Sequence, residues 1–155
     1  YKALVRPHLE YCHSITYPCY IGDAKLIESV QRRATKQLSI LKDKPYIERL
    51  KILSLPSMNY RFKRGDMIEL YKITHGMYSS SIASVQLINN SSITRGHSFK
   101  LIKNRCSTSL RLKSFPFRCI ENWNKLPVPV VEAPSLNSFK SRLDLHWAEQ
   151  LYSHA

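Results

Sequence analysis

The sequence predicts a mainly α-helical protein, because several segments place apolar side chains at three- and four-residue steps and only one short segment resembles a strand. We expect a helical bundle over residues 1–77, a polar, uncharged linker over 78–94 and a basic module over 95–155. The basic module has room for one small β-hairpin and ends in a helix. Since 43% of the 155 residues are apolar, a packed core is expected.

The first long helix is expected to begin after Asp23, a favourable N-cap residue. Apolar side chains then recur at helical spacing over about five turns and should face the core. They are Ile27, Val30, Ala34, Leu38 and Leu41. Glu28 precedes Arg32 by four residues, a spacing that partly neutralises this arginine. Arg33 and Lys36 have no acid at the matching spacing, so they are the freer cations.

Two further helices are expected in the first half of the chain. Asp43 should cap a short helix whose first turn holds Pro45, and a longer helix should run from about residue 57 to residue 75. Apolar residues cover more than one side of the longer helix, so it should lie between layers. Its acids Asp66 and Glu69 stand among basic residues and are expected to form internal ion pairs rather than to do chemistry.

Beyond the linker, residues 99–103 suggest a short strand. Between Phe115 and Leu126, aromatic and aliphatic residues form a helical stripe, which we interpret as core, with a base-stacking platform as the alternative. Ser135 should cap the last helix.

The charge distribution favours a polyanionic partner. The chain has 24 basic and 11 acidic residues, a net charge of +13. Residues 95–125 alone hold eight basic side chains and one acidic side chain, so most of these cations should lack a protein partner. We expect nucleic acid as the partner, and a basic surface that serves solubility alone is the weaker interpretation. His97 would either contact phosphate or belong to a simple turn.

Neither a metal site nor an active site is predicted in this chain. The cysteines Cys12, Cys19, Cys106 and Cys119 form no close C-x-x-C pair, so we expect buried free thiols, with a zinc site as the weaker alternative. Nucleotide addition needs carboxylates that hold two magnesium ions, and every Asp here is isolated. We therefore expect no enzyme activity, no cofactor and no small-molecule substrate. The apolar runs are too short to cross a membrane.

Particular strings then carry a family resemblance. They are V-R-P-H-L-E-Y at 5–11, V-Q-R-R-A-T-K at 30–36, R-G-D at 64–66, T-R-G-H at 94–97 and W-N-K-L-P at 123–127. In this order they resemble the region that follows the polymerase palm in reverse transcriptases (RNA-directed DNA polymerases) of non-LTR, LINE-type, jockey-like retrotransposons. The first string is similar to the stretch that opens the thumb in that family.

The resemblance implies that residues 1–77 are thumb-like and that the chain grips template, primer or element RNA. The implied partners are RNA and/or DNA as template-primer, together with the rest of the same polyprotein. The palm of that polyprotein would supply the catalytic Asp residues and magnesium. The chain would then be a piece of a longer, intracellular polypeptide in the nucleus and cytoplasm, with no membrane partner.

We expect sequence-tolerant contacts with phosphates. The candidate nucleic-acid-binding residues are Arg32, Arg33, Lys36, Lys63, Arg64, Arg95, Lys100, Lys103, Arg105 and Arg111. The main rival is a structural or protein-interaction module that docks on the missing palm, with the basic residues incidental. A sequence-specific helix-turn-helix is a weaker alternative, because the helix after Pro45 lacks a base-reading set of Asn, Gln or Arg.

Overall fold

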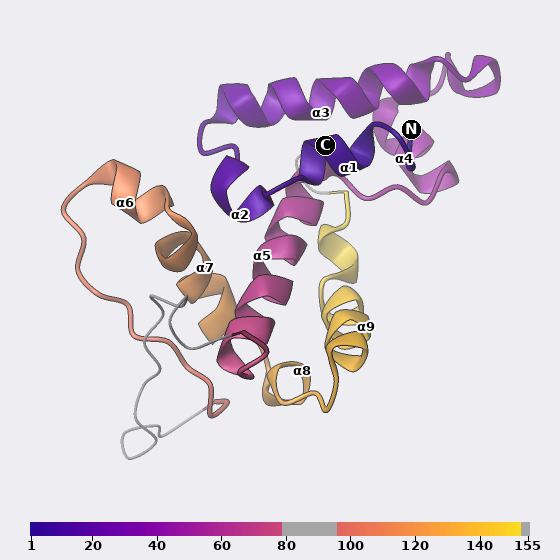
Figure 1. The fold of residues 1–155 in the computed structure, drawn as a ribbon. Coiled ribbons are helices and arrows are strands. Elements are labelled where there is room, and N and C mark those ends of the chain that lie inside the picture. Colours follow the sequence, from indigo (N-terminus) through magenta and orange to yellow (C-terminus); the bar gives the residue numbers. More distant parts are fainter. Residues whose placement is uncertain (79–95, 153–155) are drawn as a thin grey trace. The chain divides into compact units, whose positions relative to one another are not determined.

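The computed structural model describes residues 1–78 and 96–152, and these are mainly helical, as predicted (Figure 1). The helices are α1 (Arg6–Glu10), α2 (His13–Thr16), α3 (Ile21–Lys36), α4 (Tyr46–Ile52), α5 (Met58–Thr74), α6 (Ser109–Lys113), α7 (Phe115–Asn124), α8 (Val128–Val131) and α9 (Leu136–His146), with 3-10 turns η1 (Ser39–Leu41) and η4 (Ala148–Gln150). Of the predicted linker, residues 79–94 lie outside the described part of the chain. Within the described ranges, no helix has the length and apolar character needed to cross a bilayer.

The chain divides into two compact units, which we describe one at a time. Unit 1 contains residues 1–64 and 147–155, and unit 2 contains residues 65–146. The division falls inside α5, whereas the helical bundle predicted from the sequence ended at residue 77.

Two of the predicted caps, Asp23 and Asp43, are wrong, and the third, Ser135, is confirmed. α3 begins at Ile21, so Asp23 lies in its first turn, where its charge still suits the helix dipole. Pro45 is the N-cap of α4 rather than a first-turn residue. Ser57 caps α5, because its hydroxyl accepts the Tyr60 N–H at 3.3 Å. Likewise, the Ser135 hydroxyl accepts the Ser138 N–H at 3.2 Å at the start of α9.

The buried face of α3 in unit 1 is polar, which contradicts the apolar stripe that we predicted. Its buried side chains are Glu28, Gln31 and Thr35. The stripe residues Ile27, Val30 and Ala34 are only half-buried, Leu38 is 46% exposed, and Leu41 alone is buried. Polar side chains can be buried in this way only where other groups satisfy their hydrogen bonds.

Those hydrogen bonds come from residues far along the chain. The Glu28 carboxylate accepts the Tyr46 hydroxyl and, at 2.8 Å, the backbone N–H of Met58 at the start of α5. The Gln31 amide donates to the Pro56 carbonyl at 3.0 Å and accepts the Tyr1 hydroxyl at 2.7 Å. Burial and the bond to Glu28 raise the pKa of Tyr46. The Glu28 carboxylate therefore satisfies a backbone N–H at the N-terminus of α5, where a negative charge is also favourable.

Within unit 1, an ion pair joins the V-R-P-H-L-E-Y segment at residues 5–11 to α5. The Arg61 guanidinium binds the Glu10 carboxylate through two contacts, Nε to Oε1 and Nη2 to Oε2, the second at 2.7 Å. Arg6 lies 3.6 Å from the same carboxylate. The charged residues of the V-R-P-H-L-E-Y string therefore hold local structure in this unit.

Unit 2 has an aromatic core, as predicted for the stripe in α7. Trp123 is fully buried, Ile120 is 5% exposed, and Phe139 of α9 is fully buried. Phe139 also stacks on Tyr71, with ring centroids 4.4 Å apart. At the start of α7, however, Phe115 is only half-buried.

The strand predicted over residues 99–103 is wrong, because the structure has no strand among its described residues. Leu101 forms only an isolated β-bridge, and the Asn124 side chain also binds its backbone. The Asn124 amide accepts the Leu101 N–H and donates to the Leu101 carbonyl, both at 2.9 Å. The Trp123 indole N–H donates to the Phe99 carbonyl at 2.8 Å. The W-N-K-L-P string thus fixes an extended segment through side chains.

The acids of α5 form ion pairs, as predicted. In unit 2, Asp66 receives two hydrogen bonds from the Arg118 guanidinium, at 2.9 and 2.8 Å. The side chains of this pair are only 4% and 12% exposed. Glu69 pairs with Lys72 at 3.3 Å.

We expect unit 2 to lose stability as the pH falls, because two of its histidines are held neutral. His97 is fully buried, and its Nε2 lies 3.2 Å from the Trp123 carbonyl. The His75 ring is stacked on Tyr71 at 3.9 Å and on Phe99 at 4.4 Å. Burial lowers the pKa of both imidazoles.

An unfolded histidine titrates near pH ~6.5. Because the folded-state pKa lies lower, the unfolded state binds more protons between the two values. The contribution of these neutral histidines to the free energy of unfolding is therefore fully present above about pH 6.5. It is lost as the pH falls toward the folded-state pKa. Thermal melts across this range should show a falling Tm, and His97→Gln should weaken the trend. A melting temperature that does not change with pH would contradict it.

Candidate nucleic-acid interface

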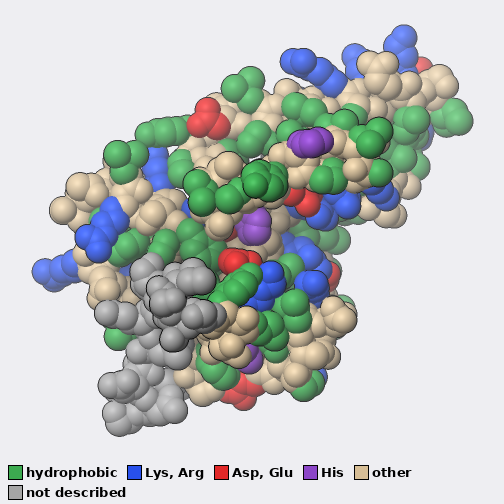
Figure 2. Space-filling view, viewed as in Figure 1, with side chains coloured by type: hydrophobic (Ala, Val, Ile, Leu, Met, Phe, Trp, Pro, Cys, Tyr) green, Lys and Arg blue, Asp and Glu red, His purple; other side chains and the backbone are tan. Residues whose placement is uncertain are grey.

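The exposed basic face of α3 is the first part of the candidate site. Lys25, Arg32 and Lys36 lie on one side of α3, at steps of seven and four residues, and Arg33 is adjacent to Arg32; all four are exposed. Within the described residues, none of these four cations forms an ion pair. Figure 2 shows Lys and Arg side chains that project from the part of the surface to which α3 belongs. The face therefore carries positive charge that no carboxylate of residues 1–78 or 96–152 pairs with.

Glu28 does not neutralise Arg32 in the way the sequence suggested. The Glu28 carboxylate turns inward to Tyr46 and to the N-terminus of α5, as described above. The Arg32 guanidinium instead lies over the Tyr46 ring, 4.8 Å from its centroid. This cation–π contact orients the guanidinium while its charge stays exposed.

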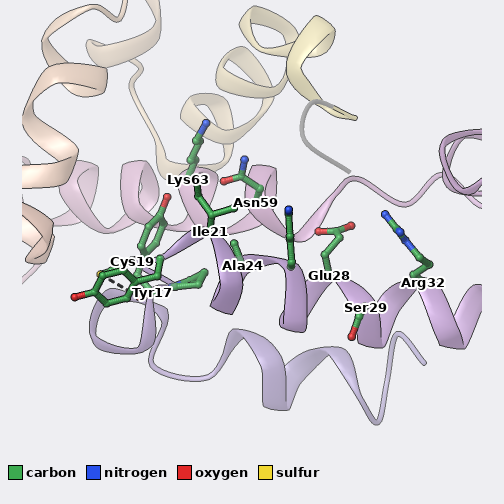
Figure 3. Close-up of a pocket in the computed structure, with 12 residues that line it drawn as sticks. Tyr17, Cys19, Ile21, Ala24, Glu28, Ser29, Arg32, Asn59 and Lys63 are labelled. Atoms are coloured by element: carbon green, nitrogen blue, oxygen red, sulfur yellow. Dashed lines mark hydrogen bonds between the residues drawn. The ribbon is translucent and has the colours of Figure 1, made fainter.

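A hollow of about 840 Å³ opens beside this face in unit 1. Its lining includes Lys25 and Arg32 of α3, and Figure 3 shows Asn59 and Lys63 of α5 at the same hollow. Tyr17, Tyr20 and neighbouring residues of the segment before α3 complete it. The structure thus brings together Arg32 and Lys63, two of the residues predicted from the sequence.

The candidate residues chosen from the sequence did not include Lys25, Tyr17, Tyr20 or Asn59, which also line this hollow. Lys25 precedes Arg32 by seven residues, two helical turns, so the helical spacing alone could have found it. No such signal exists for Tyr17, Tyr20 or Asn59, because they reach the hollow from other segments of the chain.

The predicted residues of unit 2 that the structure describes lie in α6 and in the segment before it. Lys103 pairs with Glu121 at 3.5 Å, and the Arg111 guanidinium lies 5.1 Å from the centre of the Phe117 ring. Arg105 is exposed and has no ion pair within the described residues. Lys100 packs its side chain against Gly96. Lys103 was expected to lack a protein partner, but its charge is paired with that of Glu121.

Gly96 is required at its position beside Lys100. Its φ of +102° is rarely adopted by residues that have a side chain, so a substitution there would be strained. A Cβ would also come within 2.6 Å of the Lys100 Cε atom, which lies at the flexible end of that side chain and can move away. Its neighbour His97 is buried against Trp123, which favours a structural turn over a phosphate contact. Arg95 lies outside the described residues, and Arg64 is half-buried in α5.

The cysteines depart from expectation. Cys119 is buried, Cys106 is half-buried, and Cys12 and Cys19 are exposed, so only one of the four is the buried free thiol that we predicted. Burial raises the pKa of the Cys119 thiol, so it stays protonated. Over residues 1–78 and 96–152, no cluster of three or more His, Cys, Asp or Glu side chains is arranged to hold a metal ion.

Fold and site together define a mainly helical protein with an uncompensated basic surface on α3. Comparisons with family models, with curated proteins and with solved structures gave no match to this chain.

Proposed function

We propose that this chain is a non-catalytic, nucleic-acid-binding part of a non-LTR retrotransposon reverse transcriptase, and that it holds template and primer or element RNA. The observation that carries the proposal is the basic face of α3, whose four cations have no ion-pair partner within the described residues. The family resemblance of the sequence strings supplies the biological setting.

The geometry of the face suits phosphate contacts. Lys25 and Lys36 are separated by roughly 16 Å along the helix axis, at 1.5 Å per residue. That length lets the face meet several phosphates of one strand. Contacts of this kind position the nucleic acid without reading its sequence, so binding should be sequence-tolerant and should fall with salt.

Chemistry is assigned to the rest of the polymerase in this proposal. The chain has no adjacent Asp pair, and the palm of the same polyprotein would supply the catalytic carboxylates and the magnesium ions. The setting of a retrotransposon polymerase places the chain in the cytoplasm and nucleus, where it meets element RNA and target DNA.

A docking module for the palm is the second candidate function, and the apolar surface of unit 1 favours it. Leu4, Tyr11, Ile15 and Ile21 are each at least 77% exposed, and Leu26 is 67% exposed. Exposed apolar side chains in such number mark an interaction surface for another protein when they are contiguous. This function does not need the basic face of α3.

Binding measured across a salt series tests the proposal. The full chain should bind a template-primer duplex, and log affinity should fall with log salt at roughly 0.7 to 0.9 units for each phosphate contacted. We therefore expect a slope of about −3 or steeper if the α3 face is engaged. The absence of binding, or an affinity insensitive to salt, would refute the proposal and leave palm docking as the better account.

A further inference from the structure

The hollow beside α3 differs from the rest of the basic face, because cations line it together with the half-buried Tyr17 and the exposed Tyr20. Ligand sites in proteins occupy roughly 300–1,000 Å³, and this hollow lies in that range at about 840 Å³. It is large enough to take one nucleotide unit of a strand but not a duplex. What it could hold depends on its charge and on its rings.

The charge of the hollow is positive. Neither Lys25 nor Lys63 has an ion-pair partner within the described residues. The Arg32 guanidinium packs over the Tyr46 ring, and its charge stays exposed. Glu28 also lines the hollow, but its carboxylate is already engaged by the Tyr46 hydroxyl and the Met58 N–H. The hollow is therefore lined by three cations and by one carboxylate whose hydrogen bonds point inward.

The rings suit a planar partner. Tyr17 packs edge-on against the buried Phe62, with centroids 5.9 Å apart, so its ring has a fixed position. Tyr20 is 57% exposed and stands directly before α3. An aromatic ring of this kind can stack on a nucleobase only when the base is unpaired, because the faces of paired bases are covered by their neighbours. The Asn59 amide at the same hollow offers hydrogen bonds to a base edge.

We propose that this hollow binds an unpaired nucleotide of single-stranded RNA or DNA. The base stacks on Tyr20, and Lys25, Arg32 and Lys63 hold the flanking phosphates. The inference rests on the proposed function and deepens it, because it assigns unpaired template to the hollow. Arg33 and Lys36 lie farther along α3 and bind further phosphates of the same strand.

The test compares Tyr20→Ala with a matched control, Tyr11→Ala, in the full chain. Tyr11 is 77% exposed in the same unit and does not line the hollow. The probes are fluorescent oligouridylate, oligothymidylate and a DNA duplex of equal length, followed by anisotropy. Loss of one base stack should weaken binding of both single strands by roughly 5- to 140-fold. The duplex affinity should stay within about twofold, and Tyr11→Ala should change neither.

Tyr20→Phe separates stacking from hydrogen bonding and protects against a folding artefact. It keeps the ring and loses only the hydroxyl, so it should bind single strands like the wild type, whereas a drop equal to that of Tyr20→Ala would overturn stacking. If the wild type binds both forms but Tyr20→Ala binds single strands normally, the hollow is not the site and the proposed function stands. If the wild type binds neither form, both are overturned. A stronger effect on oligouridylate than on oligothymidylate would assign the hollow to RNA, and the reverse would assign it to DNA.

Discussion

Replacing Arg32, Arg33 and Lys36 with Gln is expected to flatten the slope of log affinity against log salt by about 2 to 3 units, at roughly 0.7 to 0.9 per lost phosphate contact. All three side chains are exposed, and none forms an ion pair within the described residues. The loss should therefore appear mainly in binding, with only a small change in the free energy of unfolding. Duplex and single-strand affinities measured over a salt series, with melting curves alongside, provide the measurement.

The contact between Arg32 and Tyr46 calls for a second variant that leaves Arg32 in place. Because its guanidinium lies over the Tyr46 ring, its removal should also cost about 0.5–1 kcal/mol of stability. The double variant Arg33→Gln/Lys36→Gln avoids that contact and should still flatten the slope by about 1.4 to 1.8 units. Lys44→Gln, an exposed lysine that already pairs with Glu48, should leave the slope unchanged.

An unchanged slope in a folded triple variant would mean that α3 is not the binding surface. The palm-docking alternative makes the opposite prediction for this experiment. It expects a normal salt slope, and it expects association with a separately expressed palm to depend on exposed apolar residues such as Ile15 and Leu26.

Replacing Arg118 with Met should destabilise unit 2 by about 3–5 kcal/mol, because it leaves the Asp66 carboxylate buried without its cation. The pair is held by two hydrogen bonds, and the side chains are 4% and 12% exposed. Since whole domains are stable by only about 5–15 kcal/mol, a loss of this size should be plain in urea or thermal unfolding.

Two further variants identify the cause. Asp66→Leu/Arg118→Met removes both charges and should recover much of the lost stability, because apolar side chains often replace a buried ion pair without cost. Lys44→Gln breaks an exposed pair and should change the free energy of unfolding by less than about 1 kcal/mol. If Arg118→Met behaves like Lys44→Gln, the pair contributes little to the stability of unit 2.

The helical character of this protein could be predicted from the sequence, because it depends on spacing within short segments. The long helix expected over residues 57–75 is α5, Met58–Thr74, with Ser57 as its cap. The aromatic stripe of α7 is core at Trp123, as its helical spacing indicated. The exposed cations Arg33 and Lys36 were also found in this way, since a lack of acids at helical spacing is a local property.

The tertiary structure decided which polar residues are buried and which residues share a site. Glu28 and Gln31 are buried because Tyr46, Met58 and Pro56 complete their hydrogen bonds. The residue spacing within α3 carries no information about those partners. The prediction that its apolar stripe would be buried was therefore wrong.

The expected strand failed for the same reason. Leu101 finds its backbone partners on the Asn124 side chain, 23 residues away. The hollow, too, combines Tyr20 and Arg32, at the start and in the body of α3, with Lys63 of α5. Spacing along a sequence determines the conformation of a helix, whereas contacts between residues far apart in the chain arise only when the whole unit folds and are therefore read from the tertiary structure alone.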